Sequence, residues 1–128
     1  MASDWYNSGC EKYDSEDYQG AIADYTKAIK LKPNYANAYY NRGLAKGMLE
    51  DPQGAIADYT KTIKLKANFA EAYFNRGLGK SKLGDYQGEI ADYRSRIAPR
   101  AGVDWKDLAL LPPEQATNCR LPDAPGSA

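Results

Sequence analysis

The sequence contains no histidine, and this absence excludes most forms of nucleophilic catalysis. A serine or cysteine nucleophile usually needs a neighbouring base, which is most often histidine. Only two cysteines are present, Cys10 and Cys119, and they lie far apart. Two distant cysteines form neither a disulfide framework nor a metal site, so we interpret them as free thiols in a reducing compartment. The sequence therefore predicts a cytoplasmic protein with no catalytic residue, no metal and no cofactor.

The chain also lacks net charge, because 17 Lys and Arg residues balance 17 Asp and Glu residues. Without an overall positive charge, no global field attracts nucleic acid or an anionic membrane, although a local basic patch is compatible with this balance. No run of about 18 apolar residues predicts a transmembrane helix. The start, MASDWYNSG, lacks the basic and apolar regions of a secretory signal. We therefore expect neither nucleic acid nor membrane as a partner.

The sequence does contain an internal repeat with a period of 34 residues. Residues 19–34 return almost unchanged as residues 53–68. Several residues recur three times in this register: Asn7/Asn41/Asn75, Gly9/Gly43/Gly77, Ile22/Ile56/Ile90 and Tyr25/Tyr59/Tyr93. A fixed period of this length predicts a solenoid, in which each unit buries its apolar face against its neighbours. Because a solenoid presents an extended surface, we expect the protein to bind a partner rather than to catalyse a reaction.

Each unit is predicted to be a pair of antiparallel helices. The apolar spacing in the second half of each unit is typical of an amphipathic helix. The six predicted helices cover residues 2–15, 18–31, 36–49, 52–65, 70–83 and 86–97. Asp17, Asp51 and Asp85 mark the turns within the pairs. The recurring glycines lie inside helices, where glycine is unfavourable, so we predict that each makes room for a tyrosine of the second helix, such as Tyr25 or Tyr59.

These residues resemble the tetratricopeptide repeat (TPR) family, whose units carry an aromatic, Gly, Ala, a second aromatic and a closing Pro at fixed offsets. The first unit matches at Trp5, Gly9, Ala21, Tyr25, Ala28 and Pro33. The second matches at Tyr39, Gly43, Ala55 and Tyr59, but has Thr62 and Ala67 at the last two positions. The third keeps Tyr73, Gly77 and Tyr93, but has Glu89 and Arg96 where alanine is usual. The resemblance implies an all-α, right-handed superhelix of three helix-turn-helix units.

The resemblance divides the chain into units at residues 2–35, 36–69 and 70–102, the last with an atypical end. Residues 103–111 carry Trp105, Leu108 and Leu111 at helical spacing, with Asp104 as a candidate cap. Many TPR arrays close with an extra helix, and we predict a short one here, followed by a disordered tail over residues 112–128. The first unit begins almost at the first residue, as it would in a piece of a longer array. The similar second helices would also suit an engineered consensus array, but the irregular third unit and tail argue against it.

Charged residues also recur with the repeat: Asp24/Asp58/Asp92, Arg42/Arg76 and Lys12/Lys46/Lys80. A catalytic carboxylate is needed at one site only, so a carboxylate present in every unit favours a structural role. We predict a ladder of ion pairs between repeats. Anion binding by the Arg and Lys rows is the more specific alternative. An enzyme that uses the carboxylates for catalysis is the least favoured alternative.

In TPR arrays the first helix of each pair lines a concave groove, so the resemblance also implies where a ligand binds. The predicted peptide-binding residues are Tyr6, Asn7, Asn37, Tyr40, Asn41, Leu44, Met48, Glu71, Phe74, Asn75, Leu78 and Lys82, with Cys10 also facing inward. A carboxamide can donate to and accept from a peptide backbone, and an aromatic row adds flat apolar contact. We expect the strongest contacts at Tyr40, Asn41, Phe74 and Asn75. The alternative is that these residue types are simply common at these positions in the family and that the face stays solvated without a ligand.

One TPR subtype grips the C-terminal carboxylate of heat-shock chaperones with two Lys, two Asn and one Arg. The corresponding residues here are Tyr6, Cys10, Asn41, Glu71 and Asn75, of which only Asn41 fits. A buried carboxylate without cations is poorly held, so we predict no such clamp. The expected function is a non-catalytic scaffold for a peptide or helix of another protein. The alternative is self-association into homo-oligomers through the atypical third repeat or the C-terminal segment, which can also occupy its own groove.

Overall fold

A computed structural model describes residues 1–97, which form six α-helices and, within that range, no strand. The helices are α1 (Ala2–Asp14), α2 (Tyr18–Leu31), α3 (Ala36–Met48), α4 (Pro52–Leu65), α5 (Ala70–Lys82) and α6 (Tyr86–Ile97). All six helices begin where the sequence predicts, whereas α1, α3 and α5 each end one residue early. The short helix predicted over residues 103–111 and the tail over residues 112–128 lie outside the described residues.

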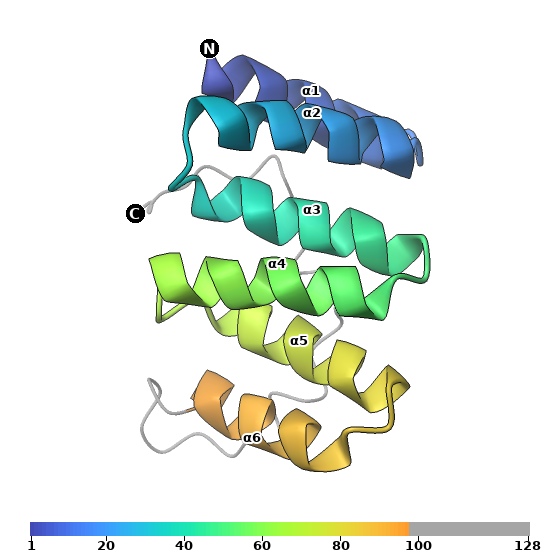
Figure 1. The fold of residues 1–128 in the computed structure, drawn as a ribbon, viewed down its shortest axis with the longest axis vertical. Coiled ribbons are helices and arrows are strands. Elements are labelled where there is room, and N and C mark those ends of the chain that lie inside the picture. The colour runs from blue at the N-terminus through green and yellow to red at the C-terminus, as the bar shows by residue number, and fades with distance from the viewer. Residues whose placement is uncertain (98–128) are drawn as a thin grey trace.

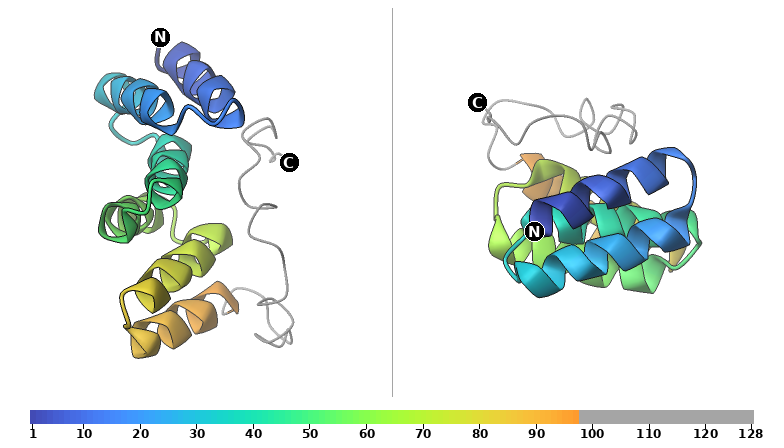
Figure 2. Two further views of the ribbon diagram at one scale, coloured as in Figure 1. Left: turned by 90° about the vertical axis from the view of Figure 1, so that its right-hand side faces the viewer. Right: turned by 90° about the horizontal axis from the view of Figure 1, so that it is seen from above.

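Consecutive helices pack against one another and form an all-α solenoid, with α1 and α6 at its two ends (Figure 1). The turns that join α1 to α2, α3 to α4 and α5 to α6 lie along one edge of the stack, and the turns α2–α3 and α4–α5 lie along the other (Figure 1). Figure 2 shows α1, α3 and α5 along one side of the array and α2 and α4 along the opposite side. Equivalent residues of successive units therefore form rows that run along the array.

The recurring glycines allow the two helices of each unit to approach closely, as predicted. A Cβ atom at position 9 would lie 2.6 Å from Cε1 of Tyr25, and one at position 43 would lie 2.7 Å from Cε1 of Tyr59. The third pair has the same geometry, with 2.9 Å between a Cβ atom at Gly77 and Tyr93. Because protein interiors are packed to crystal density, none of these sites has room for a methyl group.

Each turn within a helix pair closes in the same way, and this closure explains why the first helices end early. The backbone N–H of Glu16 donates to the carbonyl of Tyr13 at 2.9 Å, and that of Asp17 donates to the carbonyl of Lys12 at 2.8 Å. This Schellman arrangement places one residue in the left-handed conformation. That residue is Glu16 (φ 65°), Glu50 (φ 60°) or Gly84 (φ 82°) in the three units.

An aspartate follows each of these turns and caps the next helix. The carboxylate of Asp17 accepts a hydrogen bond from the backbone N–H of Gly20 at 3.0 Å. Asp51 and Asp85 cap α4 and α6 through the same contact. The three aspartates that mark the turns in the sequence are therefore N-caps, which stabilise a helix by about 1 kcal/mol each.

The third unit accommodates Glu89 in the place of a buried alanine. The hydroxyl of Tyr93 donates to Oε2 of Glu89 at 2.9 Å, so the carboxylate has a polar partner beside the helix seam. The side of α6 that faces away from α5 is more exposed to solvent than the equivalent sides of α2 and α4. Ile90 is 46 % exposed, whereas Ile22 and Ile56 are half-buried beneath the following unit.

Candidate functional site

The predicted ligand-binding residues all lie on α1, α3 and α5, but their exposure differs. Five are buried: Tyr40, Asn41, Leu44, Phe74 and Asn75. Four are half-buried: Tyr6, Asn37, Glu71 and Leu78. Three are exposed: Asn7, Met48 and Lys82. The four residues with the strongest expected contacts are thus all in the buried group.

The aromatic and carboxamide rows are joined to each other across the boundary between units. Nδ2 of Asn41 donates to Oη of Tyr6 at 2.8 Å, and Nδ2 of Asn75 donates to Oη of Tyr40 at 2.9 Å. Burial raises the pKa of the Tyr40 phenol well above its ordinary value, so this hydroxyl stays neutral. These side chains therefore hold successive units together. A role in ligand contact remains a prediction for them.

An aromatic ring also packs against each of the two tyrosines that accept these hydrogen bonds, Tyr6 and Tyr40. The ring of Tyr35 stacks on Tyr6 with centroids 5.0 Å apart, and the ring of Phe69 packs on Tyr40 at 4.8 Å. Tyr35 and Phe69 immediately precede α3 and α5, so the linkers between units also contribute to the seam. The prediction did not include these two residues, although their aromatic character at equivalent positions was a visible signal.

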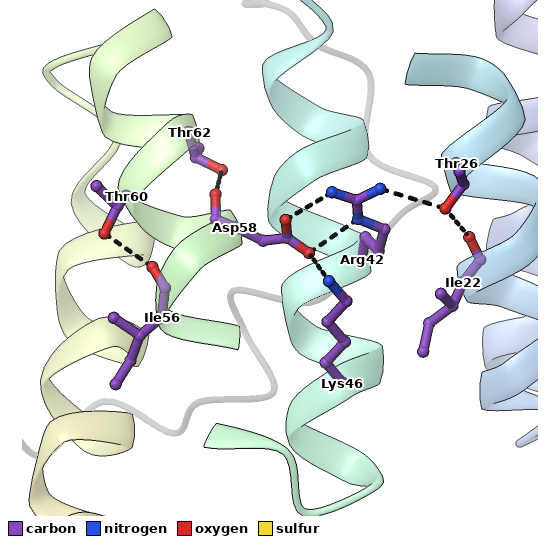
Figure 3. A network of polar contacts seen from close by, with 8 residues as sticks. All are labelled: Ile22, Thr26, Arg42, Lys46, Ile56, Asp58, Thr60 and Thr62. Atoms are coloured by element: carbon purple, nitrogen blue, oxygen red, sulfur yellow. Dashed lines mark hydrogen bonds and ion pairs between the residues drawn. The ribbon is translucent and has the colours of Figure 1, made fainter. Parts of the chain in front are cut away.

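The recurring charges form a network inside each unit (Figure 3). Nε and Nη2 of Arg42 donate to the two carboxylate oxygens of Asp58, at 2.9 and 2.8 Å. Nζ of Lys46 lies 3.1 Å from Oδ2 of the same carboxylate. Nη1 of Arg42 donates to Oγ1 of Thr26 at 3.2 Å, and that hydroxyl donates to the carbonyl of Ile22. Arg76, Asp92, Lys80 and Thr60 repeat this arrangement in the third unit.

This geometry corrects the predicted ladder of ion pairs between repeats. The ion pairs join the two helices of one unit, and the arginines reach the preceding unit through hydrogen bonds instead, from Arg42 to Thr26 and from Arg76 to Thr60. The two arrangements use the same repeating residues, so the sequence period alone does not separate them. All three nitrogens of Arg42 already donate to protein atoms, which argues against the alternative of anion binding by the arginine row.

The first unit has a shorter version of the network, because Ser8 replaces the arginine. Oγ of Ser8 donates to Oδ2 of Asp24 at 2.6 Å, and Nζ of Lys12 lies 3.0 Å from the same oxygen. Burial alone would raise the pKa of Asp24, but the Ser8 hydrogen bond and the Lys12 ammonium outweigh it and lower the pKa. Asp24 is therefore a buried carboxylate with one cation in contact, Lys12, and a second, Lys27, at longer range.

The places that correspond to a carboxylate clamp are occupied by packing residues. Cys10 is buried and is a free thiol, and the hydroxyl of Tyr25 points at its sulfur from 3.5 Å. Asn41 already donates to Tyr6. Glu71 brings a negative charge to this face, and its backbone carbonyl accepts from Asn75. A ligand carboxylate at these positions would meet no cation.

The described part of the molecule, residues 1–97, offers neither a candidate metal site nor a candidate membrane span. That range contains no group of three His, Cys, Asp or Glu side chains arranged to hold a metal ion. No helix in it is both long and apolar enough to cross a membrane. The surface of α1, α3 and α5 stays the candidate site that the sequence predicts.

Comparisons with known proteins match two family descriptions, "TPR repeat" over residues 9–49 and "Tetratricopeptide repeat" over residues 36–69. The solved structure of MamA superimposes with a TM-score of 0.76 and 30 % identity, covering 77 % of this chain, which spans 57 % of that one. The TPR domain of Arabidopsis OM64 gives 0.77 and 28 % identity, covering 84 % of this chain and 89 % of that domain. No curated protein sequence matches the chain.

A third similar structure is the first TPR of Spaghetti (RPAP3), bound to the HSP90 peptide SRMEEVD. It superimposes with a TM-score of 0.78, covering 90 % of this chain and 91 % of that one. Its 23 % identity shows a shared fold alone.

Proposed function

Because the chain belongs to the tetratricopeptide repeat family, we propose that it is a non-catalytic scaffold that binds a segment of another protein along α1, α3 and α5. The proposal assigns the binding contacts to the side chains of this surface that the array does not need for its own packing. These are exposed and half-buried members of the predicted set, chiefly Met48, Glu71 and Lys82.

One observation carries the proposal: this surface changes in every unit, whereas the exposed residues of the opposite surface are the same in the first two units. Successive units place Ser3, Asn37 and Glu71 at one position, and Asp14, Met48 and Lys82 at another. The exposed residues of α2 and α4 are identical instead: Gln19/Gln53, Ala23/Ala57, Lys27/Lys61 and Lys30/Lys64. A surface that differs along its length can bind three different parts of one partner segment, while a repeated surface cannot distinguish them.

The chemistry of these side chains describes the segment that would fit. Met48 is 53 % exposed and offers a flexible apolar contact near one end of α3. Glu71 places a carboxylate at the start of α5, and Lys82 places an ammonium at its end. A segment with an apolar side chain near Met48 and a basic one near Glu71 would be complementary. We do not extend to this chain the peptide bound by the RPAP3 domain, because the clamp positions here lack cations.

A peptide selection tests the proposal. Random peptides displayed on phage would be selected on the folded protein, and their affinities measured for a Met48→Ala, Glu71→Ala double variant. We expect a loss of about tenfold or more, since two interface contacts are removed. A Gln19→Ala, Gln53→Ala double variant on the opposite surface is the matched control. If the control loses affinity and the first variant keeps it, binding is on the wrong side and the proposal fails.

A second test concerns the clamp. Titration with a free acidic C-terminal peptide and with its amidated form should show no difference in affinity. Micromolar binding that disappears on amidation would show that a terminal carboxylate is held despite the missing cations.

A second candidate function, self-association through the third unit, is favoured by the exposed outer side of α6. Tyr86 is 63 % exposed and Ile90 is 46 % exposed. A second copy cannot cover them by stacking its α1 in the register of the repeat, because Glu11 stands where Gly79 fits. A Cβ atom at Gly79 would already lie 3.1 Å from Cγ1 of Ile56. Association would instead join α6 to α6 around a two-fold axis.

Light scattering after size exclusion, over a range of concentrations, tests this second candidate. We expect an Ile90→Ser variant to lose a dimer that the parent forms. Deletion of residues 103–128 separates the two routes: a dimer that survives the deletion is held by α6, and one that disappears is held by the C-terminal segment.

A further inference from the structure

Lysines gather at the edge of the array where α2 and α4 end. The six are Lys27, Lys30 and Lys32 in the first unit, and Lys61, Lys64 and Lys66 in the second; all are exposed. We call this row the lysine edge. The cations of the internal network differ, since each is ion-paired with a buried aspartate. Within residues 1–97, no ion pair involves any lysine of the lysine edge.

Aromatic rings position most of these lysines. Nζ of Lys27 lies 4.2 Å from the ring centroid of Trp5, and Nζ of Lys32 lies 4.7 Å from that of Tyr35. The equivalent ammonium groups of the second unit lie 5.8 and 5.7 Å from the rings of Tyr39 and Phe69. These contacts hold the ammonium groups at the edge without neutralising them. Lys27 also interacts at longer range with the buried carboxylate of Asp24, which Lys12 contacts directly.

The opposite edge carries the opposite charge. Its turns expose Glu16 and Asp17 in the first unit, Glu50 and Asp51 in the second, and Asp85 in the third. We call this row the acidic edge. Helices of 13 or 14 residues separate the two edges, which corresponds to about 20 Å. Within residues 1–97, Lys82 is an exposed cation beside the acidic edge, whereas Lys12, Lys46 and Lys80 pair with the internal aspartates.

We propose that the acidic edge of one copy binds the lysine edge of a second copy, so that arrays associate side by side. Both rows repeat with the same stack of helix pairs, so a copy shifted sideways without rotation brings the acidic turns of the first two units opposite the two sets of lysines. Both rows are also strongest in the first two units. The contact is heterologous, and each bound copy leaves a lysine edge and an acidic edge for further copies.

This association depends on ionic strength, because every charge in it is exposed to solvent. The screening length is about 30 Å at 0.01 M salt and about 8 Å at 0.15 M. Single exposed pairs are weak, so the contact requires several of them at once and a high protein concentration. The apolar route through α6 has the opposite dependence, since salt does not weaken apolar contacts.

Sedimentation equilibrium of the full chain tests the proposal with two edge reversals. One variant carries Lys30→Glu and Lys64→Glu, and the other carries Glu16→Lys and Glu50→Lys. We expect the parent chain of 14.1 kDa to show at least a twofold rise in weight-average mass at about 0.01 M salt, which disappears at about 0.5 M. Each variant alone should associate much less than the parent, because the charge of its lysine edge falls from +6 to +2 or that of its acidic edge falls from −5 to −1. An equal mixture of both should associate again, since the unchanged acidic edge of one variant attracts the unchanged lysine edge of the other.

A Lys82→Glu, Arg94→Glu variant is the matched control for net charge, because it makes the same change away from the lysine edge and should still associate. Circular dichroism confirms that each variant is folded. Three results overturn the proposal: a parent that stays monomeric at low salt, association that survives high salt, or two edge variants whose mixture does not recover. Association that survives salt but is lost with Ile90→Ser would assign it to α6 instead.

Discussion

The left-handed residue in each helix-pair turn predicts how glycine and alanine change the stability of the array. The three equivalent turns serve as controls for one another, because two carry glutamate and one carries glycine. Three equivalent turns place Glu16, Glu50 and Gly84 at φ 65°, 60° and 82°. A side chain with a Cβ atom is strained in this conformation, whereas glycine is not. We therefore expect Glu16→Gly and Glu50→Gly to stabilise the array, and Gly84→Ala to destabilise it.

The magnitude follows from two opposing terms. Relief of the left-handed strain is worth about 1–2 kcal/mol per residue. Glycine also adds freedom to the unfolded chain, which costs about 0.4–1 kcal/mol. The net gain is about 0.5–1 kcal/mol at each glutamate, and the two sites should add because they lie in separate units. At Gly84 no atom lies within 4 Å of a Cβ position, so Gly84→Ala reports the backbone term without a packing change.

Urea unfolding followed by circular dichroism measures these effects at about 0.15 M salt and low protein concentration, where association by charge is suppressed. The Glu16→Gln, Glu50→Gln variant removes the charge but keeps the Cβ atom, and it should leave the midpoint nearly unchanged. If the glutamine variant is stabilised as much as the glycine variant, charge repulsion rather than backbone strain is the cause. If Gly84→Ala is neutral, the assigned strain is absent and the reasoning is wrong.

Two other predictions concern packing and pH. Gly43→Ala should destabilise the array by about 1–3 kcal/mol, because its methyl group would meet Tyr59 at 2.7 Å. Gly47→Ala in the same helix places its methyl group 4.0 Å from the Tyr59 hydroxyl, so it should stabilise the array by about 0.5–1 kcal/mol. Equal effects of the two in thermal unfolding would contradict the close-approach argument. Because the pKa of Asp24 is lowered in the folded state, its contribution to stability is complete above its ordinary pKa and is lost as pH falls through the folded value. Asp24→Asn should therefore flatten the loss of stability in acid, and an unchanged slope would contradict the assignment.

The helix pairs and their close approach were predictable because they depend on local and periodic signals. The glycines identified their tyrosine partners, and the capping aspartates identified the turns. The strained residues were not predictable in the same way, because glutamate at positions 16 and 50 gives no sign of a left-handed conformation. Only Gly84 carried such a signal.

Whether the ion pairs lie within a unit or between units was not predictable from the repeat period. Arg42 recurs with both Asp24 and Asp58, so a contact within a unit and a contact between units produce the same repeat in the sequence. The structure selects Asp58 and gives the contact with the preceding unit to Thr26. Geometry decides this point, since a planar guanidinium can hold one carboxylate with two nitrogens and still use its third.

The same ambiguity affects the candidate site more deeply, because the residues that looked best suited to a ligand also hold the units together. Tyr40→Ala would remove a buried ring, at about 3–5 kcal/mol for a large aromatic, and would leave the Asn75 carboxamide without its hydroxyl partner. Loss of a ligand in that variant would therefore not separate recognition from unfolding. Recognition has to be tested where the array tolerates change, at Met48, Glu71 and Lys82. The variation of the surface from unit to unit at these positions is what a binding role requires and what packing alone does not explain.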